Sequence, residues 1–453
     1  MDRSGPAGAV LVASDRRVRL DRVAPAAADT AVALVSAECT LSDLVRATGL
    51  APDAVTGAIH RFDRLGLIRH TVADDRKTLL SLDPMSGRPF GLSCRSAQRG
   101  GVVLSRFAFS RRHGGRLVLE SPLSHYRATL HTPAVAGLLP LLACGDDERP
   151  AAIPDAALGS CVELLVHAGL AVSTAEAGAQ APSPGRDIEE KALAGWSFHD
   201  LLFHSRSRPG MHDYPIGRTY PMRGKAAPLP AVPAQRGERL PLAGPDAHRS
   251  DHADPSFTAV LERRRSVRVH GGEPITVAAL AEFLYRSARV RRIIPADPDA
   301  GIPYESSVRP YPSGGGAYDL EIYVVANRCT GLDQGVYHYA ADAHALDRVG
   351  SASRWTEALL ADAKRGCALR GEPQVLLVLT ARFTRLSWKY SGMAYSMTLK
   401  NVGVLYQTMY LVATAMKLAP CALGTGNPAL LGRVLNLPFT EESSVGEFLL
   451  GVE

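Results

Sequence analysis

Hydrophobic residues near the start of the chain recur at helical spacing on both sides of a turn. Within residues 40–70, the apolar positions are Leu41, Leu44, Val45, Val55, Ile59, Phe62 and Leu65. Gly49 and Pro52 separate the two groups, and Gly66 follows the second. Steps of three and four put side chains on one helix face, so this segment is predicted to form helix, turn, helix and then strand. We expect a winged-helix-like domain over residues 30–90.

A weaker copy of this pattern follows over residues 96–180. Residues 157–172 repeat the order of helix, glycine and apolar strand, with Gly169 in the place of Gly66. Before them, residues 102–121 hold two β-rich runs around Gly114 and Gly115, which indicate a hairpin. We expect a second winged-helix-like domain here. Residues 181–250, rich in proline and glycine, are predicted to be a linker or a segment that wraps the next domain.

From about residue 256 the pattern changes to alternating helices and strands. Mostly apolar runs at 320–326, 335–340 and 375–381 predict strands, the last of them fully buried. Apolar residues from 399 to 416 recur at steps of three and four, which predicts a long helix in a core or a subunit interface. We therefore expect an α+β domain over residues 251–453.

Composition removes several classes of protein from consideration. The 453 residues include 51 Lys and Arg against 45 Asp and Glu, so a net charge of +6 is too weak to indicate nucleic acid by itself. The seven cysteines form no CxxC pair, which fits a reducing cytoplasm. His199 and His204 are five residues apart, which does not place two metal ligands on one helix face. No apolar run is long enough to span a membrane, and we see no secretory signal.

Two segments have the residue types that bind phosphate or a planar ligand. Arg264, Ser266 and Arg268 in RRRSVR offer two guanidinium groups and a hydroxyl to one phosphate, although a solvated basic run is the alternative. Glycines 314–316 follow Pro312 and Ser313, and they let the backbone approach a ligand closely. A plain turning loop explains these glycines equally well, and a GxGxxG dinucleotide fingerprint is absent.

Two further segments lie after predicted strand and helix ends. Lys389 and Tyr390 stand between the buried strand and the long helix, where apolar surroundings can lower the pKa of a lysine and make it a base. A surface lysine beside a packing tyrosine is the alternative. Gly424 and Gly426 flank Thr425 in a segment that we interpret as a loop, either an anion-binding turn or a helix-ending one.

Taken in order, these motifs resemble a known family. RRRSVR, PYPSGGGAYDLEIYVV, GVYHY, WKYSGMAY, CALGTGNP and SSVGEFLLG are similar to the motifs of the SagB-type, or McbC-like, dehydrogenases of the nitroreductase superfamily. The resemblance covers residues 257–453 and extends more loosely upstream through LSRFAFSRR, VLESP and WSFHDLLFHSRSRPG. It implies a nitroreductase-like FMN-binding fold and the oxidation of azoline rings in ribosomally made peptides.

The resemblance also implies roles for individual residues. The FMN phosphate and ribityl chain are expected at Arg264, Ser266 and Arg268, and the flavin ring at the loop of Pro312, Ser313, Gly314 and Gly315. Gly424 and Gly426 match a late phosphate-side loop, and Gln407 falls on the helix of the dimer interface and flavin pocket. Lys389 and Tyr390 match the pair associated with azoline oxidation.

Azoline oxidation removes a proton and a hydride from adjacent ring carbons, so it needs a hydride acceptor and a base. We expect FMN and Lys389 in these roles, with Tyr390 as a positioning or relay partner and dioxygen as final oxidant. The expected partners are an azoline-containing precursor peptide, whose leader the winged-helix-like segments bind by strand addition, a cyclodehydratase complex and a second copy of the chain.

The sequence departs from the family pattern at two places and leaves alternatives open. Ser396 and Val404 stand where the family commonly has arginine and histidine. An NAD(P)H-dependent nitroreductase, a winged-helix DNA-binding regulator and a non-catalytic scaffold are the competing hypotheses. The modest basic charge, with only His60, Arg61 and Arg64 on the candidate recognition helix, disfavours the regulator.

Overall fold

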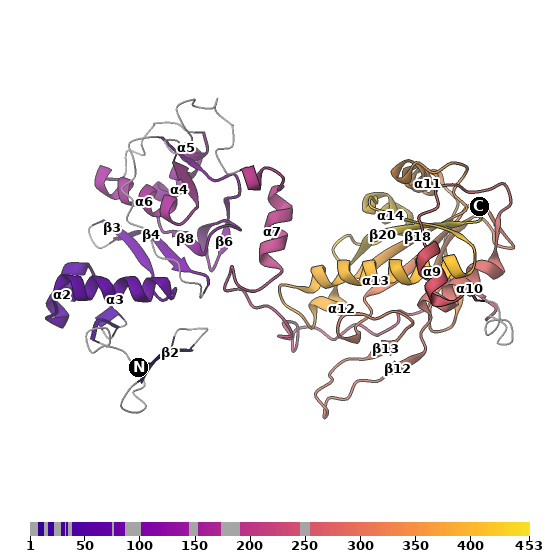
Figure 1. The fold of residues 1–453 in the computed structure, drawn as a ribbon, viewed down its shortest axis with the longest axis horizontal. Coiled ribbons are helices and arrows are strands. Elements are labelled where there is room, and N and C mark those ends of the chain that lie inside the picture. Colours follow the sequence, from indigo (N-terminus) through magenta and orange to yellow (C-terminus); the bar gives the residue numbers. More distant parts are fainter. Residues whose placement is uncertain are drawn as a thin grey trace. The chain divides into compact units, whose positions relative to one another are not determined.

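The structure is a computed structural model, and it divides the chain into two compact units, Met1–Tyr214 and Pro215–Glu453 (Figure 1). It describes residues 8–12, 17–21, 29–31, 33–34, 39–74, 77–86, 101–144, 153–173, 191–244 and 254–453. Each unit is described by itself below. Among these residues, none of the helices combines the length and the apolar character needed to cross a bilayer.

The first unit opens with a small hairpin, β1 (Gly8–Val12) and β2 (Arg17–Asp21). Helices α2 (Leu41–Thr48) and α3 (Pro52–Arg64) follow, with Thr40 capping α2 and Gly49 ending it in a left-handed conformation. Strands β3 (His70–Asp74) and β4 (Lys77–Pro84) come next. This is the predicted order of helix, turn, helix and strand.

The strands of both winged-helix-like segments lie in one sheet. Its order is β3, β4, β8 (Tyr126–Leu130), β7 (Arg116–Glu120) and β6 (Phe109–His113), so β3 is an edge strand. The β6–β7 turn contains Gly114 and Gly115, as predicted. A separate pair joins β5 (Val102–Leu104) to β9 (Ala171–Ser173). The division into two winged-helix-like domains stays a prediction.

Helices complete the first unit. They are α4 (Pro133–Ala136), α5 (Leu138–Cys144), α6 (Asp155–His167), a 3₁₀ turn (Lys191–Leu193) and α7 (Phe198–Arg206). One hydrophobic core joins the sheet to α4, α5 and α6. The end of the unit is tied to the sheet at Glu120, whose buried carboxylate accepts hydrogen bonds from Arg111, Arg127 and Tyr214.

The second unit is built on a seven-stranded antiparallel sheet. Its order is β10 (Glu238–Pro241), β17 (Ala345–Ser351), β16 (Gly335–Ala340), β14 (Leu320–Ala326), β18 (Val375–Arg382), β20 (Glu442–Gly451) and β19 (Ala419–Leu423). Three of these strands coincide with the predicted apolar runs. Two short pairs, β11 (Ile275–Thr276) with β15 (Cys329–Thr330) and β12 (Arg292–Ile294) with β13 (Ser306–Val308), lie outside the sheet.

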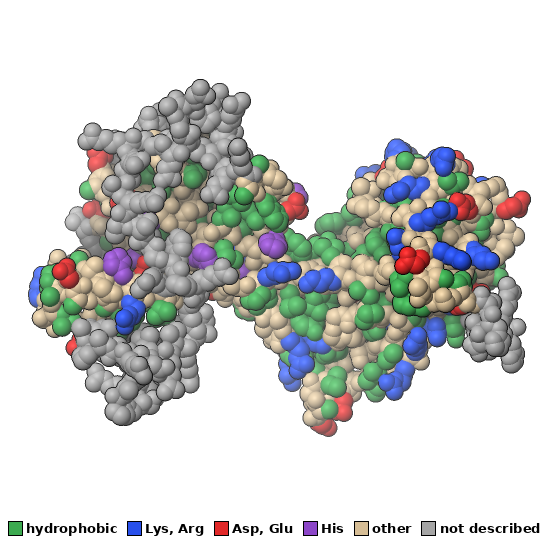
Figure 2. All heavy atoms as spheres, in the orientation of Figure 1, with side chains coloured by type: hydrophobic (Ala, Val, Ile, Leu, Met, Phe, Trp, Pro, Cys, Tyr) green, Lys and Arg blue, Asp and Glu red, His purple; other side chains and the backbone are tan. Residues whose placement is uncertain are grey.

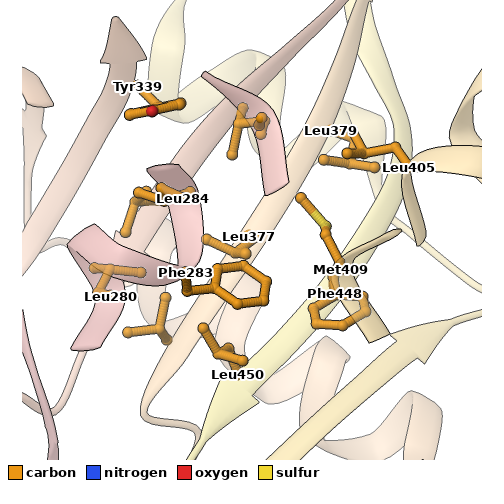
Figure 3. Packing of buried hydrophobic residues seen from close by; sticks show 14 of the residues in the cluster. Leu280, Phe283, Leu284, Tyr339, Leu377, Leu379, Leu405, Met409, Phe448 and Leu450 are labelled. Atoms are coloured by element: carbon orange, nitrogen blue, oxygen red, sulfur yellow. The ribbon is translucent and has the colours of Figure 1, made fainter. Parts of the chain in front are cut away.

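Helices cover both faces of this sheet, which explains why its central strands are buried at every position. Leu377 and Leu379 of β18 pack with α10 (Val277–Ala288) and α13 (Ala394–Ala415) in one core. Leu376 and Val378 face the other core, with α11 (Arg354–Cys367) and α14 (Pro428–Leu435). Figure 3 shows the first core, where Phe283 stacks on Phe448 with ring centroids 6.3 Å apart.

Residues 215–237, which we call the strap, run over the second unit without regular structure and lead into β10. Their backbone carbonyls accept hydrogen bonds from buried side chains of the unit: Trp388 donates to Ala226, Arg385 to Leu229 and Arg382 to Pro230. This part of the predicted linker or wrapping segment therefore belongs to the second unit.

Candidate functional site

Lys389 and Tyr390 lie in the turn between two helices. The chain leaves β18, forms one helical turn in α12 (Thr384–Ser387), and then reaches both residues before α13 begins. The Lys389 and Tyr390 N–H groups both donate to the Leu386 carbonyl, at 3.0 and 2.8 Å. This fixed turn holds the Lys389 side chain in the protein, with only 4% of the residue exposed.

The Lys389 ammonium lies between two phenol rings and a backbone carbonyl. Its Nζ donates to the Tyr304 hydroxyl and, at 3.1 Å, to the Gly315 carbonyl. It is 4.5 Å from the ring centroid of Tyr304 and 5.2 Å from that of Tyr390. Burial lowers the pKa of Lys389, and Tyr390 opposes this shift. A lowered pKa makes more of the lysine neutral at a given pH, and the neutral amine is the form that can accept a proton.

Gly315 brings the glycine loop against this pair. Its φ is +61°, a conformation that favours glycine, and a side chain there would begin 2.7 Å from Lys389 Nζ and in contact with the Tyr390 hydroxyl. Gly315 itself is exposed. The loop thus offers a bare backbone surface directly beside the lysine, and the structure brings together two of the predicted motifs.

A buried carboxylate fixes the glycine loop. The loop forms a 3₁₀ turn at Gly314–Gly316, and the Gly314 N–H donates to Asn401 Oδ1 at 3.0 Å. Asn401 and Thr398 in turn donate to Asp319 at 2.7 and 2.6 Å. Burial raises the pKa of Asp319, and these two hydrogen bonds oppose it.

Ser313 and Pro312 precede the three glycines of this loop. The Tyr318 N–H donates to Ser313 Oγ at 3.1 Å, which helps close the turn. Pro312 is exposed beside the glycines. The prediction that Pro312 and Ser313 face a ligand stays a prediction.

The arginine–serine segment is extended. It begins where α9 (Phe257–Arg263) ends, and the buried Val267 donates its N–H to the Pro420 carbonyl at 2.8 Å. Ser266 Oγ lies 2.7 Å from the Tyr410 hydroxyl, and the Arg264 guanidinium stands 5.3 Å from the Tyr410 ring centroid. Arg268 is exposed.

Helix α13 joins this segment to the glycine loop. Asn401 binds the loop and Tyr410 binds Ser266, and nine residues of helix separate them. At 1.5 Å per residue this is about 13 Å along the axis. The two motifs are thus held at the ends of one rigid span.

The late glycines follow β19, which occupies Ala419–Leu423. Cys421 to Leu423, which open the quoted motif, pair with β20, and the predicted loop with Gly424, Thr425 and Gly426 begins directly after them. Gly424 has open space where a side chain would begin, whereas the Glu447 carboxylate fills that space at Gly426. A cavity of about 240 Å³ lies beside Gly426, Thr425, Asp362 and Glu447.

Gln407 lies on the exposed face of α13, and within the described chain no contact joins it to the other predicted residues. The two positions that depart from the family pattern lie on the same helix. The Ser396 hydroxyl donates to the Met393 carbonyl at 3.0 Å, and Val404 packs against the core.

Two functional contacts were missed by the sequence reasoning. Tyr304, which contacts Lys389, lies in a loop with no periodic pattern, so no signal marked it. Asp319, which fixes the glycine loop through Asn401, lies inside the quoted motif AYDLEIYVV, where an acidic residue directly before a mostly apolar strand could have indicated it.

Comparison with known proteins separates the two parts of the chain. Residues 261–452 match the nitroreductase family, and residues 102–213 match the family described as cyanobactin oxidase ThcOx. The Methanocaldococcus jannaschii protein MJ1384, which carries the name of a nitroreductase, is 28% identical over 165 residues, 36% of this chain and 76% of that protein.

Two Escherichia coli proteins are also similar. The microcin B17-processing protein McbC is 30% identical over 147 residues, 31% of this chain and 52% of that protein, so the match spans about half of its length. The structure of the microcin synthetase McbBCD complex with truncated pro-MccB17 matches with a TM-score of 0.35 and 22% identity, over 51% of this chain and 90% of the other.

These matches confirm the resemblance predicted from the motifs and the α+β, nitroreductase-like character of the C-terminal region. They do not test the winged-helix-like segments. Residues 261–452 match the nitroreductase family, and the chain resembles the McbC-like oxidoreductases of that superfamily.

Proposed function

We propose that this protein is an FMN-dependent dehydrogenase that converts azoline rings to azoles in a ribosomally made peptide. The observation that carries the proposal is the buried Lys389 ammonium beside the exposed, side-chain-free backbone of Gly315. A flat ring stacked on that backbone would lie next to a group able to take up a proton. The names of the similar proteins, a cyanobactin oxidase family and a microcin-processing protein, support a peptide substrate.

The residues of the second unit fit FMN. Gly315 is exposed, and its missing side chain leaves room for Lys389 Nζ and the Tyr390 hydroxyl beside the place proposed for the flavin ring. Arg264 stands at the other end of the α13 span, and Arg268 follows on the same segment. Their neighbour Arg265 pairs with Glu453, whereas no ion pair engages Arg264 or Arg268 within the described chain. Guanidinium groups without an ion pair suit a phosphate.

The remaining cofactor contacts follow from the same placement. Pro312, Ser313 and Gly314 would lie along the flavin ring, and Ser266 near the phosphate. Gly424 and Gly426 would contact the cofactor from the loop after β19. Gln407 would reach the cofactor only from the exposed face of α13, which is proposed below as the dimer interface.

The chemistry divides between the cofactor and the chain. When bound, FMN supplies the acceptor for the hydride, and dioxygen is the final oxidant in this proposal. Lys389 takes the proton from the adjacent ring carbon at Nζ, which requires the neutral amine. The lowered pKa of Lys389 makes that form available closer to neutral pH. Tyr390 keeps the amine directed at the ring.

Replacing Lys389 tests this assignment. We expect Lys389→Gln to retain FMN and lose azoline oxidation by about 10²- to 10⁴-fold, the usual contribution of a general base. Lys364→Gln is the control, because Lys364 is an exposed lysine of the same unit paired with Glu372. The readout is the loss of two hydrogen atoms per ring by mass spectrometry. Full activity of Lys389→Gln, or a folded protein that binds no FMN, would contradict the proposal.

An NAD(P)H-dependent nitroreductase is the second candidate, favoured by the match to MJ1384. Nitro-group reduction by NAD(P)H does not require a buried lysine held between two phenols. Rapid bleaching of the bound flavin by NADPH, together with unchanged nitro-group reduction in Lys389→Gln, would favour it over the azoline dehydrogenase.

The leader of the peptide has a candidate site in the first unit. Strand β3 is an edge strand, and a cavity of about 680 Å³ lies beside it, lined by residues of α2, α3, β3 and α6. An edge strand next to an apolar groove is suited to strand addition. Leu41 lines this cavity and is exposed, as is Leu123 elsewhere in the unit. We expect Leu41→Glu, but not Leu123→Glu, to weaken binding of a labelled leader peptide measured by anisotropy.

A second copy of the chain is the other proposed partner, besides a cyclodehydratase complex. The exposed face of α13 carries Tyr395 and Leu399, and Figure 2 shows hydrophobic side chains on the face of residues 215–453 where Figure 1 draws this helix. An apolar helix face of this kind suits a homodimer seam. Sedimentation of the purified protein, with Leu399→Glu as the perturbed variant, tests this.

A further inference from the structure

Tyr304 contacts the proposed base from a part of the chain that no motif marks. It lies between β12 and β13, two strands of a hairpin outside the main sheet. Its hydroxyl accepts a hydrogen bond from Lys389 Nζ, and its ring centroid is 4.5 Å from the same nitrogen. The contact therefore joins the lysine to a second tyrosine besides its sequence neighbour Tyr390.

The position of Tyr304 is fixed by its surroundings. The next residue, Glu305, accepts the Ala231 N–H of the strap at 2.6 Å through its carboxylate, and its carbonyl accepts from Arg385 at 3.0 Å. The indole of Trp388 stands edge-on to the Tyr304 ring, with centroids 6.2 Å apart. The strap and the α12 turn, which contains Arg385 and Trp388, thus hold this phenol against the lysine.

The hydrogen-bonding capacity of the groups explains what Tyr304 can do. An ammonium has three donors, and here they meet the hydroxyls of Tyr304 and Tyr390 and the carbonyl of Gly315. After loss of a proton, the amine also has a lone pair, which a hydroxyl can satisfy by turning to donate. A carbonyl can only accept. The phenols, unlike Gly315, can stay bonded to Lys389 in both of its protonation states.

We propose that Tyr304 is a positioning residue for Lys389, holding Nζ over Gly315 whether the lysine is charged or neutral. Its meaning for catalysis rests on the proposed function, but the contact itself does not. Because the Tyr304 hydroxyl accepts a hydrogen bond from Nζ, it adds to the preference for the ammonium that Tyr390 provides, whereas burial and the guanidinium groups of Arg218 on the strap and Arg385 on α12 disfavour the ammonium. Tyr304 thereby sets, with Tyr390, the pH at which Lys389 becomes a base.

The first test needs neither flavin nor substrate. Lys389 is acylated in competition with a reference amine over a range of pH, and the labelled peptide is quantified by mass spectrometry. Tyr304→Phe keeps the ring and removes the hydroxyl that accepts from the ammonium. We expect the midpoint of the labelling curve to fall by about one pH unit, as for loss of one hydrogen bond to a charged group.

Tyr285→Phe is the matched control, because Tyr285 belongs to the same unit and its ring contacts His344 and Arg289 rather than the lysine. We expect its labelling curve to match that of the unaltered protein. If Tyr304→Phe does not fold, Tyr304→Met removes the same hydroxyl and carries the same expectation. A curve for the Tyr304 variant that overlays the control would overturn the proposal.

The second test separates this inference from the proposed function. If the unaltered protein oxidises an azoline peptide, kcat of Tyr304→Phe should fall about tenfold, since a small misplacement of the base is costly. The acidic limb of its pH profile should move with the labelling midpoint. A moved midpoint with an unmoved pH profile would refute the positioning role. If the unaltered protein oxidises no azoline, the proposed function fails and the labelling curve still decides the contact.

Discussion

Replacing Gly315 with alanine places a methyl group where Lys389 Nζ and the Tyr390 hydroxyl already lie. The new carbon would stand 2.7 Å from Nζ, well inside a normal contact distance. Both obstructing atoms are the free ends of long side chains, so they can move aside. The backbone φ of +61° adds a strain that any residue with a side chain meets there.

These two effects separate stability from activity. A left-handed φ costs an alanine about 1 kcal/mol, so Gly315→Ala should lower the free energy of unfolding by that amount. Gly301→Ala meets the same strain, because Gly301 has a φ of +74° with no atom near the added methyl group. Displacement of the base by about 1 Å can cost roughly 100-fold in rate. We therefore expect equal stability and very different activity.

The assay compares the two variants side by side. Urea unfolding gives the free energy of each, and mass spectrometry of an azoline peptide gives the rate. Competitive labelling reports whether Lys389 has moved, independently of turnover. If Gly315→Ala retains the activity and the labelling curve of Gly301→Ala, the close contact between the glycine loop and the lysine is not part of the working site.

Three further outcomes follow from the site. Because burial lowers the pKa of Lys389, its neutral form should appear at lower pH than that of an ordinary lysine. The rate should therefore rise with pH and level off below the usual lysine range. A pH profile of kcat/KM checks this, and an inflection at the ordinary lysine pKa would contradict it. Tyr410→Phe removes the hydroxyl that meets Ser266 and the Ala422 N–H, and we expect about tenfold weaker FMN binding by fluorescence titration, with Tyr285→Phe unchanged. Arg385→Met leaves the Ala317, Leu229 and Glu305 carbonyls without their donor, which should lower the free energy of unfolding by about 3 kcal/mol in a urea titration; a loss below 1 kcal/mol would show that water replaces it.

Elements with a strong local pattern were predictable from the sequence. Strands at Leu320–Ala326 and Gly335–Ala340 coincide with the predicted runs because all of their residues are buried, and their polar residues Glu321 and His338 hydrogen-bond to each other within the sheet. The long helix extends at its N-terminus to Ala394, five residues before the predicted start at 399, and in this extension the polar Thr398 donates to the buried Asp319 and interrupts the apolar pattern.

The site was only partly predictable. Lys389, Gly315 and Ser266 lie in local motifs, but how these motifs are placed relative to one another depends on contacts between segments far apart in the chain. Lys389 and Tyr304 are 85 residues apart, and neither lies in a periodic pattern. Such a pair follows from the path of a hairpin outside the main sheet, which local spacing does not encode.

The strap offers its partners peptide carbonyls rather than side chains. Ala226, Leu229 and Pro230 could each be exchanged for many other residues with the accepting oxygen left in place. Its sequence is therefore free to drift while its course over the arginines is kept. Related proteins should therefore be able to keep the backbone path of the strap after its amino-acid sequence has diverged. A search for the strap in other proteins should compare backbone paths.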